Sequence, residues 1–164
     1  RDAFVPQVQR LAAATTTGIG MSVATQYDEW ESLSEDGAFG PLLPRVRYSS
    51  FANATIRGQI GAELTRLGSP LSVDNILERA TTQTCAGCHE ASNGKDLGGG
   101  LTWPSSNRFT HVEESGVLSK VLTTTFLPHR KQVLEAFINA RCGGAPVALP
   151  DGTTVGGSDE DAAN

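Results

Sequence analysis

The sequence predicts a mainly α fold whose helices are joined by long loops. In several stretches apolar residues recur at intervals of three and four, a spacing that places them on one face of a helix. No stretch before Val147 shows the alternation of apolar and polar residues that is typical of a strand. Glycine and proline account for 18 and 8 of the 164 residues and cluster between the helical stretches. These clusters predict the loop-rich connections.

Two helices are predicted in the N-terminal half of the chain. The first covers residues 2–14, and the run Thr15-Thr16-Thr17-Gly18 weakens its continuation. Residues 36–44 are rich in glycine and proline and predict a loop. The second helix covers residues 52–67 and ends at Gly68-Ser69-Pro70. The apolar faces of the two helices consist of Phe4, Val8 and Leu11 in the first, and Ile56, Ile60, Leu64 and Leu67 in the second.

The next predicted helix covers residues 73–84, with Ser72 as its N-cap. Its apolar side consists of Val73, Ile76, Leu77 and Ala80. The pattern leads directly to Cys85. We therefore expect this helix to hold the residues after it in a rigid position.

Two further helices are predicted in the C-terminal half. A short one covers residues 117–124, and a longer one runs from about Pro128 to Cys142, where Gly143-Gly144 ends it. The longer helix is expected to bury a stripe that consists of Val133, Leu134, Phe137 and Ile138.

The composition fits one domain, or one domain with appended segments. At 164 residues the chain can bury a real core, and because only 38% of its residues are hydrophobic, long loops are expected around that core. The net charge of -5 and the pI of about 5.1 argue against binding to nucleic acid or anionic membranes, and favour docking onto basic surfaces. No run approaches ~18 consecutive apolar residues, so no membrane span is expected.

The most specific pattern in the chain is Cys85-Ala86-Gly87-Cys88-His89. Two cysteines three residues apart with an adjacent histidine form the attachment signature of a c-type haem. Cys85 and Cys88 would add to the porphyrin vinyl groups, and His89 would bind the iron. The alternatives are a redox dithiol or half of a zinc site, but zinc needs four ligands and usually a second cluster. We therefore expect haem c, with its iron, as the cofactor.

The compartment and the third cysteine follow from this motif. Haem is attached to such sequences outside the bacterial cytoplasm, so we expect a processed protein that is periplasmic or extracellular. In an oxidising compartment Cys142 is either free and buried, or it bridges to another chain in a homo-oligomer.

Residues 72–142 resemble the single-haem cytochrome c family, in which a helix, the attachment motif, a loop-rich middle and a C-terminal helix follow in that order. The resemblance implies a cytochrome c-like haem domain over residues 71–144. An N-terminal helical segment, residues 1–70, would precede it, and a flexible acidic tail, residues 145–164, would follow. The long N-terminal segment departs from the family, as does the absence of a methionine in the downstream loop.

The sequence leaves the distal iron ligand open. The only methionine is Met21, far upstream of the motif. We prefer His111, which lies in the downstream loop and would reach the iron from the face opposite His89. His129, beside Arg130, is typical of a solvated basic edge but remains a candidate, as does an open or water-bound iron. With two histidine ligands the closed coordination would favour electron transfer and a low potential.

Other side chains are expected around the haem. Trp103 would pack on its edge or donate its indole hydrogen to a propionate, and Arg108 or Lys95 would pair with propionate charge. The glycines of residues 97–100 would let the backbone pass close to the flat ring, or would serve as ordinary turns. The apolar residues that we place around the ring are Leu97, Leu101, Phe109, Phe126 and Phe137.

These features predict a secreted monohaem c-type cytochrome that carries single electrons between redox partner proteins, with no protein nucleophile or base required. A haem enzyme, or a gas- or peroxide-binding domain with an open iron, is one alternative. A haem-containing assembly subunit, whose contacts involve Cys142 or residues 1–70, is the other.

Overall fold

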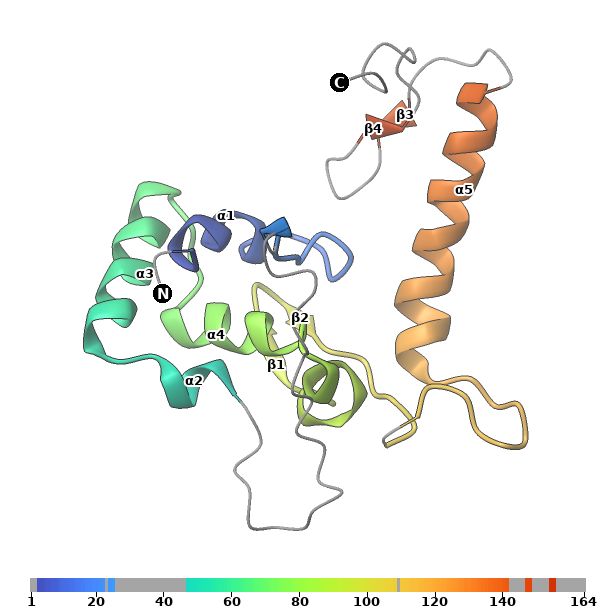
Figure 1. The fold of residues 1–164 in the computed structure, drawn as a ribbon, viewed down its shortest axis with the longest axis horizontal. Helices are drawn as coiled ribbons and strands as arrows, with labels where there is room; N and C mark the ends of the chain where they lie inside the picture. The colour runs from blue at the N-terminus through green and yellow to red at the C-terminus, as the bar shows by residue number, and fades with distance from the viewer. Residues whose placement is uncertain are drawn as a thin grey trace.

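The computed structural model describes residues 3–22, 24–25, 47–108, 110–141, 147–148 and 154–155. Within these ranges helices are the main element, as Figure 1 shows, and the mainly α prediction is confirmed. The strands are short antiparallel pairs. Asp96–Gly98 (β1) pairs with Leu101–Thr102 (β2), and Val147–Ala148 (β3) pairs with Thr154–Val155 (β4).

The first helix is shorter than its sequence pattern indicates. A 3₁₀ turn, Val5–Gln7 (η1), leads into Val8–Leu11 (α1), and the helix ends at Ala12. The side chain and the carbonyl of Thr15 both accept the N–H of Gly18, at 3.1 Å each. Hydrogen bonds to Thr15 thus stabilise a turn in place of a further helical turn. This is why the helix predicted over residues 2–14 stops before residue 14.

The predicted helix over residues 52–67 is confirmed as Ala54–Arg66 (α3), preceded by the short Tyr48–Phe51 (α2). The Asn53 side chain accepts the N–H of Ile56 and caps its start. At the other end Gly68 takes φ +62°, and the N–H of Ser69 reaches back to the carbonyl of Leu64 at 3.0 Å. This left-handed cap explains why a glycine follows the helix directly.

The helix before the cysteines is confirmed as Val73–Thr81 (α4), with Ser72 and Asn75 forming a reciprocal capping box. It ends earlier than predicted and does not run directly into the cysteines. The Thr84 hydroxyl donates to the carbonyl of Thr81 at 2.8 Å, and a turn separates α4 from the π-helical turn Gly87–Ala91 (η4).

The glycines after the motif form a hairpin that the sequence did not reveal. Gly99 and Gly100, with φ +63° and +77°, make the two-residue turn between β1 and β2. Leu97 is fully buried in the core, and a Cβ on Gly98 would lie 2.5 Å from the Asn75 side chain. The alternative that these glycines serve as turns is therefore confirmed for Gly99 and Gly100, whereas the flanking strands were not predicted, because strands of two or three residues are too short to show alternation.

One hydrophobic core joins the N-terminal residues to the segment around the motif. The helix α4 contacts α1, α3 and β1, as the first view shows (Figure 1). The core consists of Val8, Leu11, Ile19, Ile60, Leu64, Ile76, Leu77, Ala80, Leu97, Trp103 and Val121. The proposed boundary between residues 70 and 71 remains a prediction, but this core spans both sides of it.

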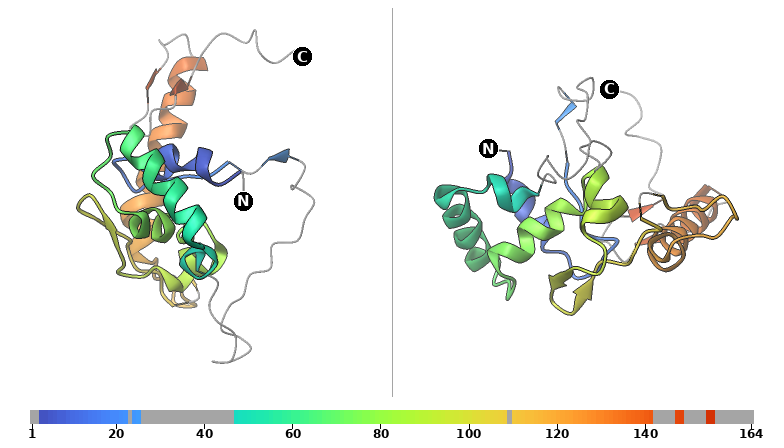
Figure 2. Two further views of the ribbon diagram at one scale, coloured as in Figure 1. Left: turned by 90° about the vertical axis from the view of Figure 1, so that its left-hand side faces the viewer. Right: turned by 90° about the horizontal axis from the view of Figure 1, so that it is seen from below.

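The last helix stands apart from this core. It runs over Leu127–Arg141 (α5), as predicted, and directly continues the π-helical segment Leu122–Phe126 (η5). The predicted helix over residues 117–124 starts late, since Leu118 instead forms a β-bridge with Val112. Figure 1 and the right-hand view of Figure 2 both show α5 to one side of α1, α3 and α4.

The prediction of a buried stripe on α5 is wrong for most of its residues. Leu134, Phe137 and Ile138 are 58%, 47% and 49% exposed, and only Ala136 is fully buried. The reason is tertiary, because α5 packs against η5 and β4 and not against the core helices of the described chain. Cys142 lies outside the described residues, as does most of the predicted tail.

Candidate functional site

The attachment motif forms a helical turn that is fixed at its start by one threonine. The Thr84 hydroxyl accepts the N–H of Gly87 at 2.9 Å, and its carbonyl accepts the N–H of Cys88 at 2.9 Å. The turn η4 is π-helical, a form that is rare and often occurs at functional sites.

Within the motif, Gly87 allows this turn to pack against the end of α4. A Cβ built at this position would lie 1.7 Å from the carbonyl oxygen of Thr81, which is closer than any real contact. The close approach of backbone to backbone therefore requires glycine.

The two thiols of the motif are free, with Cys85 exposed and Cys88 half-buried. Burial raises the pKa of the Cys88 thiol, and the neighbouring Cys85 raises it further. A redox-active or nucleophilic cysteine needs the opposite shift, towards thiolate at neutral pH. The environment of Cys88 thus does not activate this thiol as a nucleophile.

The structure brings His111 to the motif, 22 residues downstream of His89 in sequence. Its Nε2 lies 3.5 Å from the Cys88 Sγ, and its ring centroid lies 4.5 Å from that of His89 at a tilt of 38°. Burial lowers the pKa of His111 below its usual 6.5, and His89 lowers it further. A neutral imidazole is the form that binds iron.

A cavity of about 260 Å³ opens beside Cys88. Trp103 is 2% exposed and lines the cavity, and its indole Nε1 has no hydrogen-bond partner in the described structure. Phe126 packs edge-on to Trp103, with 6.3 Å between ring centroids. His129 is half-buried and also lines the cavity, beside the exposed Arg130.

Met21 lies elsewhere. It lines a separate apolar cavity of about 430 Å³ together with Phe4, Tyr48 and Ile56. The two cavities share no lining residue among those described. The structure thus brings His111 and His129 to Cys88, but not Met21.

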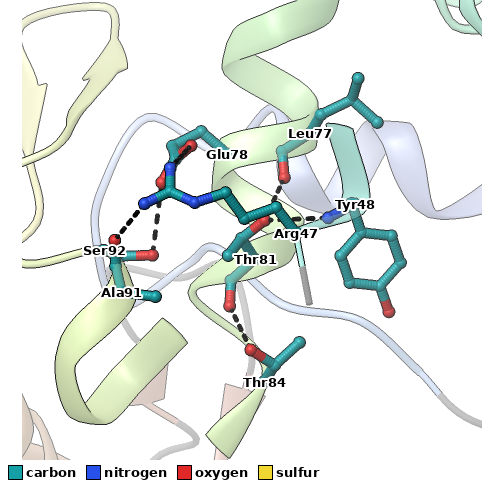
Figure 3. A network of polar contacts seen from close by, with 8 residues as sticks. All are labelled: Arg47, Tyr48, Leu77, Glu78, Thr81, Thr84, Ala91 and Ser92. Carbon is teal, nitrogen blue, oxygen red and sulfur yellow. Dashed lines mark hydrogen bonds and ion pairs between the residues drawn. The ribbon is translucent and has the colours of Figure 1, made fainter. Parts of the chain in front are cut away.

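Two polar anchors hold the motif in place, and sequence reasoning missed both. Arg47, 38 residues before Cys85 in sequence, donates to the Ala91 carbonyl at 3.1 Å and pairs with Glu78 at 3.5 Å (Figure 3). The hydroxyl of Ser92 donates to the same carboxylate at 3.5 Å. The end of η4 is thereby tied to α4 by residues that no local pattern connects.

The second anchor is Ser106, which is 8% exposed. Its hydroxyl reaches the carbonyl oxygens of His89 and Arg108, and its N–H donates to the Asn93 side chain at 2.9 Å. This serine joins the motif to the loop that carries His111.

The predicted propionate partners lie on the surface. Lys95 and Arg108 are exposed, and Arg108 takes φ +59°, a left-handed conformation that is uncommon for a residue other than glycine. Of the predicted apolar surroundings, Leu97 and Phe126 are buried or partly buried, whereas Phe137 is half exposed. Phe109 lies outside the described residues.

The donor set fits a haem better than a bare metal ion. In the ranges that the structure covers, no three His, Cys, Asp or Glu side chains are grouped so as to hold a metal ion. A haem needs only axial ligands from the protein, because the porphyrin supplies the remaining nitrogens. His89 and His111 meet beside Cys88, Trp103 and His129 line the cavity next to Cys88, and the second thiol lies on the same helical turn.

Comparisons with known proteins add nothing to this description. No family model, no curated protein and no solved structure matches the chain. No helix in the described part of the chain is long and apolar enough to cross a membrane.

Proposed function

We propose that this protein is a secreted monohaem c-type cytochrome that carries single electrons between redox partner proteins in the periplasm or outside the cell. The observation that carries the proposal is the meeting of His111 with the attachment motif. Its Nε2 lies 3.5 Å from the Cys88 Sγ, and its ring lies 4.5 Å from that of His89. Bound haem c would supply an iron that alternates between the ferrous and ferric states.

The residues have distinct roles in this proposal. Cys85 and Cys88 would form the thioether links, and His89 and His111 would hold the iron. Because the two rings are in contact in the described structure, the loop that carries His111 must move away from His89 to admit the porphyrin. Two imidazole ligands favour a lower potential than a histidine–methionine pair.

Trp103 and the surface charge support the same function. The buried indole N–H of Trp103 has no acceptor in the described structure, and a haem propionate beside the cavity would satisfy it. The net charge of -5 favours docking to a basic surface on the electron donor or acceptor.

The cytochrome c-like arrangement over residues 71–144 is part of the proposal. The order of α4, the motif, a loop-rich middle and α5 supports it. In the cytochrome c family the last helix packs near the first, whereas α5 here stands apart with apolar side chains exposed. We propose that the haem and the loop around His111 fill part of the space between them.

The test is expression of the full chain in cells that mature c-type cytochromes. The intact mass should exceed that of the bare polypeptide by one haem, and Cys85→Ser/Cys88→Ser should lose that addition. Ferric and ferrous absorption spectra should show low-spin, six-coordinate iron. His111→Ala should convert the iron to high spin. A bare polypeptide mass for the unaltered chain would end the proposal.

A second candidate is a haem domain that binds a small ligand such as a gas or peroxide. The cavity of about 260 Å³ beside Cys88, with His129 and Trp103 in its wall, favours it. Carbon monoxide separates the two candidates, because an open iron binds the gas readily whereas an iron closed by His111 resists it.

A further inference from the structure

The environment of His111 contains one hydroxyl that acts on its ring. The Oγ of Ser119 lies 3.1 Å from His111 Nδ1, the nitrogen that does not face Cys88. Ser119 is fully buried, so water does not compete for this bond. We propose that Ser119 is a positioning residue that fixes the orientation of His111 and accepts its Nδ1 proton when Nε2 binds the haem iron. The inference rests on the proposed function, since it concerns a ligand of that haem.

The backbone holds the two residues in register. The N–H of Ser119 donates to the carbonyl of His111 at 2.8 Å, and Val112 forms an antiparallel bridge with Leu118. Glu113 and Gly116 close the turn between them, with Gly116 at φ +83°. The loop is therefore a small closed unit, and Ser119 cannot move independently of His111.

The Ser119 hydroxyl can donate to His111 Nδ1 or accept from it, and binding of iron at Nε2 requires the form in which it accepts. Its oxygen already accepts the N–H of Leu122 at 3.3 Å, and a second lone pair remains to accept a bond. When His111 Nδ1 carries the ring proton and donates to that lone pair, the lone pair of Nε2 is free. Nε2 is the atom that lies 3.5 Å from Cys88 Sγ, on the side where a haem would be tethered.

The consequence for the bound iron follows from this arrangement. A hydrogen bond from the far nitrogen holds a ligating imidazole in place and increases its basicity, and the loss of such a partner costs about 10- to 100-fold in metal affinity. Without the hydroxyl, His111 should leave the iron more often. An external ligand should then compete more easily, and the reduction potential should rise, because a less basic ligand stabilises ferric iron less.

The experiment uses the full-length holoprotein and carbon monoxide as the probe. Ser119→Ala should raise the carbon monoxide affinity of the ferrous protein about ten-fold and raise the reduction potential. Ser119 also caps the helical segment that begins at Lys120, so Ser119→Gly serves as a second variant. It removes the hydroxyl as well, but glycine is a favourable N-cap residue. Ser119→Thr retains the hydroxyl, so its carbon monoxide affinity and its reduction potential should match those of the unaltered protein.

Ser72→Ala is the matched control, because it removes another N-cap serine, whose hydroxyl bonds Asn75 within its own capping box. It should leave carbon monoxide affinity and potential unchanged. If both hydroxyl-free variants fold and match the unaltered protein while His111→Ala is high-spin, the role of Ser119 is refuted and the haem proposal survives. If His111→Ala retains the low-spin spectrum, the ligand assignment itself fails and this inference with it.

Discussion

At the scale of single residues, Gly87 shows the strongest steric requirement in the site. A side chain at this position meets the Thr81 carbonyl at 1.7 Å, so Gly87→Ala must displace η4 from α4. We expect a loss of about 1–3 kcal/mol in the free energy of unfolding, together with a lower yield of attached haem. Urea unfolding and the absorbance of the haem measure the two effects.

The matched control for this substitution is Gly58→Ala on α3. A Cβ at Gly58 has no neighbour within 4 Å, and alanine favours a helix over glycine. Gly58→Ala should therefore be neutral or stabilising by up to about 1 kcal/mol. Equal losses for both variants would contradict the packing argument.

His111 gives the site a dependence on pH that is measurable without haem. Its pKa in the folded state is lowered from 6.5, first by burial and then by His89. The unfolded chain, in which the pKa is not lowered, binds the proton more readily than the folded chain, so protonation favours unfolding. The stability of Cys85→Ser/Cys88→Ser should fall as the pH drops below 6.5. Urea midpoints between about pH 8 and pH 5 measure this slope.

A third substitution isolates the contribution of His111 to the slope. In the Cys85→Ser/Cys88→Ser variant, the additional substitution His111→Gln should make the stability less dependent on pH between about pH 8 and pH 5. The reason is that it removes the group with the lowered pKa. An identical slope with and without His111 would show that other groups cause it.

At the scale of elements, Arg79 joins α4 to two segments distant in sequence. It is 1% exposed and donates to the carbonyls of Leu97, Gly98, Leu11 and Ala13 at 2.7 to 3.0 Å. Burial lowers the pKa of Arg79, but a guanidinium stays charged in proteins. The fork of donors thus fixes α1 and the β1–β2 hairpin to one side of α4.

Replacement of this arginine should be among the most destabilising changes in the chain. Arg79→Met leaves buried carbonyls without donors, at about 1–3 kcal/mol each, and we expect a total loss of about 3 kcal/mol or more. Arg57→Met is the control, because Arg57 pairs with Asp74 at 2.8 Å on the surface and such pairs contribute ~0–1 kcal/mol. Thermal unfolding of both variants compares them, and similar midpoints would contradict the proposed role.

At the scale of the whole molecule, the position of α5 predicts an asymmetry between two apolar substitutions. Phe137 is 47% exposed, whereas Ile76 is fully buried in the core. Phe137→Ser should change the stability by no more than about 0.5 kcal/mol, and Ile76→Ala should lower it by about 2–5 kcal/mol. Urea unfolding of the haem-free protein measures both. A large loss for Phe137→Ser would show that α5 packs against the core.

The sequence by itself determined the features that depend on neighbours along the chain. The cap at Ser72, the helices α3, α4 and α5, and the attachment motif all follow from residues within a few positions of one another. Their physical causes are local, namely helical periodicity and side-chain caps. Haem attachment itself remains a prediction from the motif.

Only the tertiary structure decided which distant residues meet. The anchors of η4 at Arg47 and Ser106, the buried fork of Arg79, and the approach of His111 to Cys88 all join segments well separated in sequence. The exposure of the α5 stripe was decided in the same way, because a periodic pattern states which face is apolar but not whether another element covers it. Such contacts depend on the path of the whole chain, and one sequence carries no local signal for that path.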